Sequence, residues 1–437
     1  MATPNTLTDS NILSMLKRQY RDKPENLLFA DSSVLNKIKP EIWDGDELAF
    51  PSIYGRSPAI AGDYTVAKAI AASGSTKSVQ WRVSLNRRQL HGVFTITQQE
   101  IQSSHSSKGA FMPLIKFKSK GVIEAFKKQL PCILYGNGDG AFATPTATKT
   151  ITSGANTITL RNFEIMAIDP GTQFQVGTVN ANGEAIAAET APVHTVTAIN
   201  GNVVSFNASA ADTIAVGQKL VFKGSSSGGE TLLPHGLGNW VPLTNRGSVF
   251  CNVDRSPAPD RLSGHVIDNS ALSAATNKKI STIKEAIKIG RRFGGQISDY
   301  MLAVNDDDYD DITGGLEERS QFYQTILDII VADPYVPTGE FWMFKPSNVS
   351  FVTCSNTAPL GNLSGKNEDG AEGQDDILNG PDIGEQPNQI NLDNLWSIAQ
   401  GTAVTSGESV AVGANLFGTY VVWNQSAIIR GKFPAAA

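Results

Sequence analysis

The sequence predicts an α+β protein that carries an inserted β-rich domain, and three observations support this class. Apolar and polar residues alternate from Val79 to Leu85, which is the period of a half-buried strand. Residues 113–134 repeat apolar residues in steps of three and four, which is the period of an amphipathic helix. Between residues 147 and 223 charges become rare, and short β-prone runs alternate with turns such as DPG and NANG, which favours a small β-sandwich or barrel.

The first 50 residues are predicted to form an arm. A short helix can begin after Asp9 or Ser10, and a turn-rich stretch without a clear period follows it. Such a stretch has no core of its own. We therefore expect it to bury its larger apolar side chains against other surfaces, in its own subunit or in a neighbour; these are Ile42, Trp43, Phe50 and Tyr54.

Residues 75–111 are predicted to form a long hairpin. The alternating strand leads into the turn-like NRRQ, and a second β-prone run, LHGVFTIT, follows. A two-stranded hairpin is marginally stable in water. We therefore expect this one to pack on a partner.

The predicted helix at 113–134 ends beside Gly136, Gly138 and Gly140. A phosphate-binding loop needs a strand before it and a helix after it. Here a helix comes first and a Thr-rich β region follows, so the glycines indicate a turn at a domain junction. Pro131 should mark or kink the last helical turn.

The second half resumes a mixed pattern. Residues 276–293 predict a helix with a capping box formed by Thr282 and Glu285, and residues 316–332 predict another helix. MLAVN between them reads as a buried strand, and EFWMFKP, NVSFVTC and the last thirty residues read as further strands. Residues 356–394 are polar, acidic and rich in Gly and Asn, which predicts a long loop or a partly disordered segment.

The segment from Asn305 to Glu318 has the strongest resemblance to a metal site. Three aspartates alternate and a glutamate follows at the spacing of a calcium loop, at Asp306, Asp308, Asp310 and Glu317. Asp311, however, stands where that loop needs glycine for its sharp turn. The segment is therefore predicted to be an acidic loop that caps the following helix, with calcium kept as the alternative.

Composition and motif spacing exclude most catalytic classes. The net charge of −6 provides no basic field for tight DNA binding, and no apolar run approaches the roughly 20 residues that cross a bilayer. The N-terminus lacks the features of a signal peptide, so a cytosol-like compartment is expected. The cysteines and histidines are dispersed and form no disulfide, zinc or catalytic pattern; they are Cys132, Cys251, Cys354, His91, His105, His194, His235 and His265. No catalytic, cofactor-binding or metal-binding residue is predicted, and five arginines are candidates for interface salt bridges: Arg246, Arg255, Arg261, Arg291 and Arg292.

The order of these features resembles the major capsid proteins of tailed double-stranded DNA bacteriophages, which share the Hong Kong 97-type fold. The stretches that carry the resemblance are YGRSPAIAGDYTVAKAI, the alternating hairpin, PLIKFKSKGVIEAFKKQL with the following LYGNGDGA, GLGNWVP with VFCNVDRSPAPDRLSG, and NLFGTYVVWNQSAIIRGKF. The resemblance covers most of residues 40–340 and the last thirty residues. It implies a domain order of N-terminal arm (1–50), peripheral domain with spine helix (51–74 and 112–135), E-loop hairpin (75–111), axial domain (136–146 and 224–320), β-rich insertion domain (147–223), peripheral strands with an acidic loop (321–394) and C-terminal strands (395–437).

The resemblance also implies a function. The chain would be a non-enzymatic virion protein that assembles with itself, as hexamers and pentamers, into an icosahedral shell around phage DNA. The chain keeps Met1 and has only a short N-terminal helix, so a separate scaffolding protein is expected, together with a portal and a decoration protein as further partners. Lys77 and Lys108 flank the predicted hairpin, but nothing identifies a cross-linking partner for them.

Two alternatives stay open at this point. One is a different self-assembling protein, such as a tail tube, decoration or surface-layer subunit. The other is a nucleotide- or calcium-dependent hydrolase built around the Gly and Asp runs.

Overall fold

The computed structural model describes residues 32–43, 45, 47–55, 60–73, 77–85, 87–97, 114–145, 148–180, 183–271, 276–293, 296–317, 324–354, 397–400 and 409–434. The predicted N-terminal helix and the predicted loop at 356–394 lie outside these residues. The mixture of helices and sheets confirms the α+β class.

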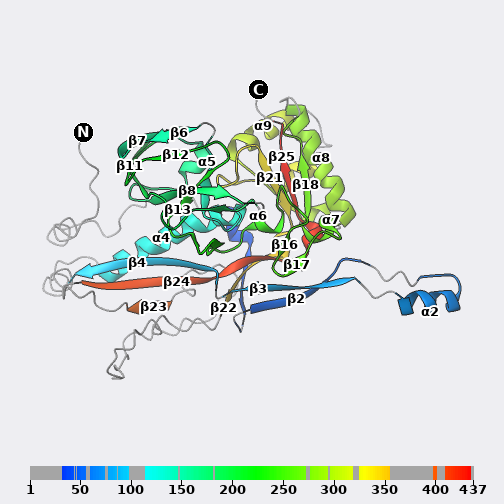
Figure 1. Cartoon of the computed structure of the whole chain (residues 1–437). Coiled ribbons are helices and arrows are strands. Elements are labelled where there is room, and N and C mark those ends of the chain that lie inside the picture. Colours follow the sequence, from blue (N-terminus) through cyan, green and yellow to red (C-terminus); the bar gives the residue numbers. More distant parts are fainter. Residues whose placement is uncertain are drawn as a thin grey trace, which may run out of the picture.

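A long helix lies along a long strand pair on one side of the molecule. Helix α4 (Leu114–Tyr135) confirms the predicted helix, and it continues past Pro131 to Tyr135. It runs beside β4 (Gln89–Thr97), which pairs antiparallel with the first part of β24 (Ser409–Val422) (Figure 1). Gly92 makes this close approach possible, because a Cβ there would lie 2.3 Å from Cγ1 of Val122.

The second part of β24 continues into a further set of strands. It pairs with β22 (Val349–Cys354), which pairs in parallel with β1 (Lys39–Trp43). Strand β23 (Ser397–Gln400) pairs with the other edge of β24, at Val412–Asn415. Strand β1 is therefore at one edge of this sheet.

The predicted hairpin at 75–111 is wrong. Strand β3 (Ser78–Ser84) pairs along its whole length with β2 (Glu47–Ile53), whereas β4 pairs with β24. The projecting two-stranded arm is therefore built from residues 47–55 and 77–84, and helix α2 (Tyr64–Ser73) lies beyond its outer end (Figure 1). Residues 51–55 and 60–73, which were assigned to the peripheral domain, belong to this arm.

Contacts near Arg88 explain why β3 and β4 do not fold back on each other. The Arg88 guanidinium donates to the carbonyl and hydroxyl oxygens of Thr231, and the Gln89 amide donates to the Leu232 carbonyl. These bonds hold the NRRQ segment against residues 231–232. The chain therefore passes from one strand pair to another instead of reversing.

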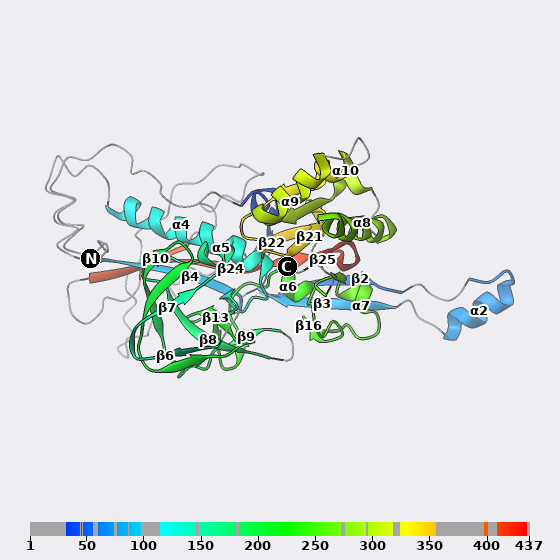
Figure 2. The ribbon, with the colours of Figure 1, turned by 90° about the horizontal axis from the view of Figure 1, so that it is seen from above.

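A second sheet forms the opposite part of the molecule. Its strand order is β18 (His265–Asp268), β25 (Ile429–Lys432), β21 (Glu340–Phe344), β19 (Met301–Val304) and β20 (Ile330–Ala332). Its helices are α8 (Thr276–Phe293), α9 (Asp306–Glu317) and α10 (Gln324–Ile329) (Figure 2). Strands β20 and β21 were predicted for the 321–394 unit and β25 for the 395–437 unit, but all three belong to the sheet that also holds β18 and β19 of the 224–320 unit. The predicted boundaries at residues 320/321 and 394/395 therefore do not separate this sheet correctly.

Two local predictions in this region also need correction. The acidic segment after Asn305 is helix α9 rather than a loop. The helix predicted at 316–332 is confirmed at the end of α9 and in α10, but residues 330–332 form strand β20. Helix α8 has the predicted bounds, but Thr282 lies inside it and donates to the Lys278 carbonyl, so it is not a capping residue.

The inserted domain has its own core. Its main sheet has the order β5 (Ala141–Ala143), β13 (Lys219–Phe222), β8 (Gln173–Val179), β10 (His194–Asn200), β11 (Val203–Ala208) and β7 (Gly154–Thr159), with β9 (Ala185–Ile186) beside β8. A smaller pair joins β6 (Lys149–Ile151) and β12 (Asp212–Ile214). The core contains Phe142, Phe174 and Phe206. Because β5 is part of the sheet, the domain begins near Ala141, before the predicted residue 147.

Short elements connect these units. They are α5 (Asn162–Ile165), α6 (Leu237–Trp240), α7 (Pro259–Leu262), the β14–β15 turn (Ser226–Ser227 and Glu230–Thr231), the β16–β17 turn (Val249–Phe250 and Val253–Asp254), and four 3-10 turns at Leu35–Lys37, Ile297–Asp299, Pro346–Asn348 and Gln425–Ala427.

Candidate assembly surfaces

The inner half of the arm is fixed to the body of the subunit. Trp81 is fully buried, and its ring lies 5.2 Å from that of Trp240. Phe50, on the paired strand, lies 5.1 Å from Trp423, ring centroid to centroid. The arm therefore leaves the body at a set angle. Phe50 was predicted to need another surface, and it finds that surface within its own chain.

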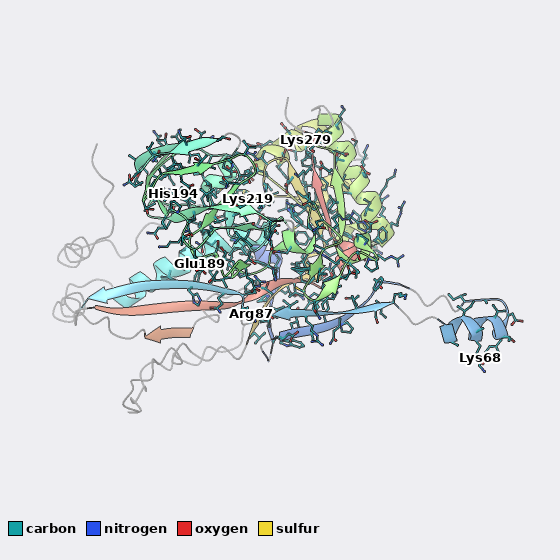
Figure 3. The ribbon with its side chains drawn as sticks, in the orientation of Figure 1. Lys68, Arg87, Glu189, His194, Lys219 and Lys279 are labelled. Atoms are coloured by element: carbon teal, nitrogen blue, oxygen red, sulfur yellow. The ribbon has the colours of Figure 1, made fainter. Side chains whose placement is uncertain are left out.

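The outer half of the arm and helix α2 are exposed. Ile60 is 81% exposed and Tyr64 is 82% exposed. Lys68 of α2 lies far from every other labelled side chain (Figure 3). Asp63 caps this helix, because its carboxylate accepts hydrogen bonds from the Val66 and Thr65 amides, and these bonds lower the pKa of Asp63. A helix of this length is marginal by itself in water. The outer arm therefore presents apolar side chains that the subunit does not cover.

The edge strand β1 presents a second apolar surface. Ile42 and Trp43 are exposed, as the sequence predicted for residues that need another surface. The Trp43 indole donates to the Glu47 carbonyl, which connects the strand to the start of β2. An exposed strand edge with large apolar side chains is a typical site for association with another chain.

A groove lies between the second half of β2, with the described residues that follow it, and the α7–α8 side of the second sheet. Its volume is about 1100 Å³, and residues of β2, α7, the end of α8 and the segment after β24 line it. Ile53, Ile60 and Phe293 supply apolar side chains, while Arg261 and Arg292 supply positive charge. The Arg261 guanidinium donates to the Tyr54 carbonyl, which connects the groove to the arm.

The glycine run lies at a junction, as predicted. Gly138 and Gly140 both have φ of +68°, a conformation that favours glycine. A Cβ at Gly138 would lie 2.9 Å from the Pro234 carbonyl oxygen. The chain then enters strand β5 rather than a helix, so the strand–loop–helix geometry of a phosphate site is not formed here.

The aspartates of the predicted calcium segment are divided between two surroundings. Asp308 is buried and accepts hydrogen bonds from Lys279 and from the Gly339 amide, and Asp311 also pairs with Lys279. Asp306, Asp307 and Asp310 face solvent. Across the described residues, no group of three or more His, Cys, Asp or Glu is arranged to hold a metal ion.

The predicted interface arginines have different roles. Arg255 is buried, donates to the Asn239 and Ser248 carbonyls and lies over the Phe250 ring, and burial lowers its pKa to about 10. Arg246 pairs with Asp260. These two stabilise the subunit, whereas Arg261 and Arg292 line the groove. The sequence did not predict this groove, because its lining comes from four separate segments.

In the described part of the chain, the cysteines and lysines considered in the sequence analysis are not arranged for catalysis or cross-linking. Burial raises the pKa of both Cys132 and Cys251 to about 12, which suits inert thiols. Lys77 packs against Gly55 at the outer end of the β2–β3 pair. The side chain of Cys354, and all of His105 and Lys108, lie outside the described residues.

Among known proteins, similarity to this chain was found in solved structures. No family model matches the chain, and no curated protein does. The chain is similar to the cyanophage A-1(L) capsid, with 9% identity and a TM-score of 0.49 over 97% of this chain and 99% of that one. It is also similar to the capsid of a native GTA particle, with 8% identity and a TM-score of 0.43 over 97% of this chain and 96% of that one. A third similar structure is the SrpI encapsulin from Synechococcus elongatus PCC 7942, with 7% identity and a TM-score of 0.41 over 98% of this chain and 95% of that one. Likenesses at these identities and scores assign no family by themselves. In the described part of the chain, no helix is both long and apolar enough to cross a membrane.

Proposed function

We propose that this chain is a major capsid protein with a Hong Kong 97-type fold, which assembles as hexamers and pentamers into the icosahedral shell of a tailed phage. The proposal combines the sequence resemblance with the shape of the subunit. It predicts no catalytic centre and no cofactor.

The projecting arm is the observation that carries the proposal. Its root is packed by Trp81 and Phe50, whereas Tyr64 of α2 is 82% exposed and Ile60, at the edge of the groove, is 81% exposed. A rigid root with an exposed apolar end is suited to reaching across a neighbouring copy. Exposed apolar side chains of this kind mark surfaces for association with another molecule.

The remaining architecture fits the same function. Helix α4 and the β4–β24 pair form an elongated layer, the second sheet lies at one end, and the inserted domain stands on the helix side of the layer (Figure 1). Extended subunits of this shape can tile a thin shell. The mild negative charge of the chain suits a container that encloses DNA with only weak nonspecific contact, because phosphate contacts dominate affinity for DNA.

The proposal includes partners and location. Subunits would assemble in the host cytoplasm with a separate scaffolding protein and a portal, and they would reside in the virion. The inserted domain is the proposed surface for a decoration protein, since it stands apart from the elongated layer.

The test removes the outer arm while leaving its root. In the shortened variant, an Asn-Gly turn replaces residues 56–76. The Tyr54 amide already bonds to the Lys77 carbonyl, so the two strands can be closed there. We expect a folded, soluble subunit that no longer closes shells in negative-stain electron microscopy. A control variant with Val203→Ser and Val216→Ser loses exposed apolar side chains on the inserted domain and should assemble normally. Shells of normal size from the shortened variant would overturn the proposed role of the arm.

A further inference from the structure

The arginine groove lies at one end of helix α8 and an acidic surface lies at the other. Arg292 is in the last turn of α8 and lines the groove. Lys279, near the beginning of α8, pairs with Asp308 and Asp311 of α9; its position is labelled in Figure 3. Thirteen residues of helix separate these two positions, which is about 20 Å. The two surfaces therefore cannot meet within one subunit.

Each of the two surfaces carries charges of one sign. The described lining of the groove contains Arg261 and Arg292 but no carboxylate. The acidic surface consists of Asp306, Asp307 and Asp310, all exposed on the first turns of α9. Burial, together with the neighbouring Asp333, Asp307 and Asp310 carboxylates, raises the pKa of Asp306, so these like charges repel one another.

We propose that the groove receives the acidic first turns of α9 from a second copy of this chain, with Arg292 and Arg261 opposite Asp306, Asp307 and Asp310. The inference rests on the proposed shell function and specifies which surfaces meet inside a capsomer. The contact is head-to-tail, because two different surfaces of each copy take part. Such contacts close into rings when the rotation between copies allows it.

The chemistry of the groove favours this occupant over nucleic acid. Among the described residues, two cations line the groove, and Ile53 and Phe293 form part of the wall. Tight binding to DNA needs several phosphate contacts. A helix end that carries three carboxylates matches two guanidinium groups with apolar surroundings, and such pairs set partner choice and association rate.

A charge-reversal cycle tests the pairing in the full chain. Arg292→Glu and Asp307→Lys should each reduce ring formation about tenfold or more, measured by sedimentation velocity, and the double variant should recover most of the loss. Lys288→Glu is the matched control, since it makes the same charge change on an exposed position of α8 away from the groove. It should leave ring formation nearly unchanged.

Several results would overturn the pairing. One is a double variant no better than the product of the two single losses, and another is Arg292→Glu indistinguishable from Lys288→Glu. A third result concerns residues 366–385, which carry seven carboxylates and one lysine. If deleting them reduces ring formation as much as Arg292→Glu does, while Asp307→Lys has no such effect, the occupant of the groove is that segment. A wild-type chain that stays monomeric contradicts the shell function as well. Wild-type rings that ignore all of these changes contradict this inference alone.

Discussion

Replacing Trp81 with alanine should destabilise the subunit strongly, because this side chain fixes the arm to the body. Trp81 is fully buried, its ring contacts those of Phe50, Trp240 and Phe250, and its indole N–H donates to the Ser52 hydroxyl 3.1 Å away. Removing a buried tryptophan of this kind costs about 3–5 kcal/mol. The lost hydrogen bond is included in that range, since Ser52 is only partly buried and water can replace the donor.

Trp43 provides the comparison that separates folding from assembly. It is 40% exposed on the edge strand β1, so Trp43→Ala should change the free energy of unfolding by no more than about 1 kcal/mol. We nevertheless expect it to slow assembly, because an exposed strand edge with large apolar side chains is a typical site for association with another chain.

The assay is urea denaturation of unassembled subunits, followed by circular dichroism and tryptophan fluorescence. Light scattering then records assembly of each variant. The reasoning is refuted if Trp81→Ala costs less than about 1 kcal/mol, or if Trp43→Ala costs as much as Trp81→Ala. The first result would mean that the arm root is not packed as described, and the second that Trp43 contributes more to the fold than its exposed position on β1 indicates.

Three other changes test separate parts of the structure. Gly92→Ala should cost about 1–3 kcal/mol, because its Cβ would overlap Val122 of α4; Gly121→Ala, at an exposed helix position with open space around it, should stabilise by about 0.5–1 kcal/mol, and equal effects in urea melts would contradict the close approach. Burial raises the pKa of Asp333 despite its bonds to Ser32 and Tyr135, so its contribution to stability should fall as pH rises from its unfolded pKa toward the raised folded value; Asp333→Asn should flatten that slope, and an unchanged slope would argue against it. A fragment of residues 140–224 should unfold cooperatively by circular dichroism, and one of residues 147–223, which lacks β5, should be less stable; a random-coil spectrum for the longer fragment would remove the claim of an independent domain.

The sequence was sufficient where the stabilising pattern is local. Ile280, Ile283 and Ile287 repeat along one face of α8, so its bounds can be predicted without knowing what it packs against. The β-rich character of residues 147–223 could be predicted for a similar reason, because the composition changes sharply there. The candidate junction at Gly138 also followed from neighbouring residues alone.

The sequence was insufficient where pairing depends on distant residues. Strand β3 alternates correctly, but its partner is β2, while the partner of β4 comes from residues 409–417. The NRRQ segment resembles a turn until Arg88 is seen bonded to Thr231. Similarly, Asp308 looks like a loop ligand until Lys279 and the Gly339 amide are found beside it. The arginine groove could not be predicted because arm, helix and C-terminal segment meet only in three dimensions.

Electron microscopy of the purified full-length chain tests the central claim most directly. The proposed function predicts closed shells, or hexameric and pentameric rings that form them when a scaffolding protein is supplied. Tubes or flat lattices would indicate a different structural protein. A stable monomer that binds ATP or calcium would contradict the proposal.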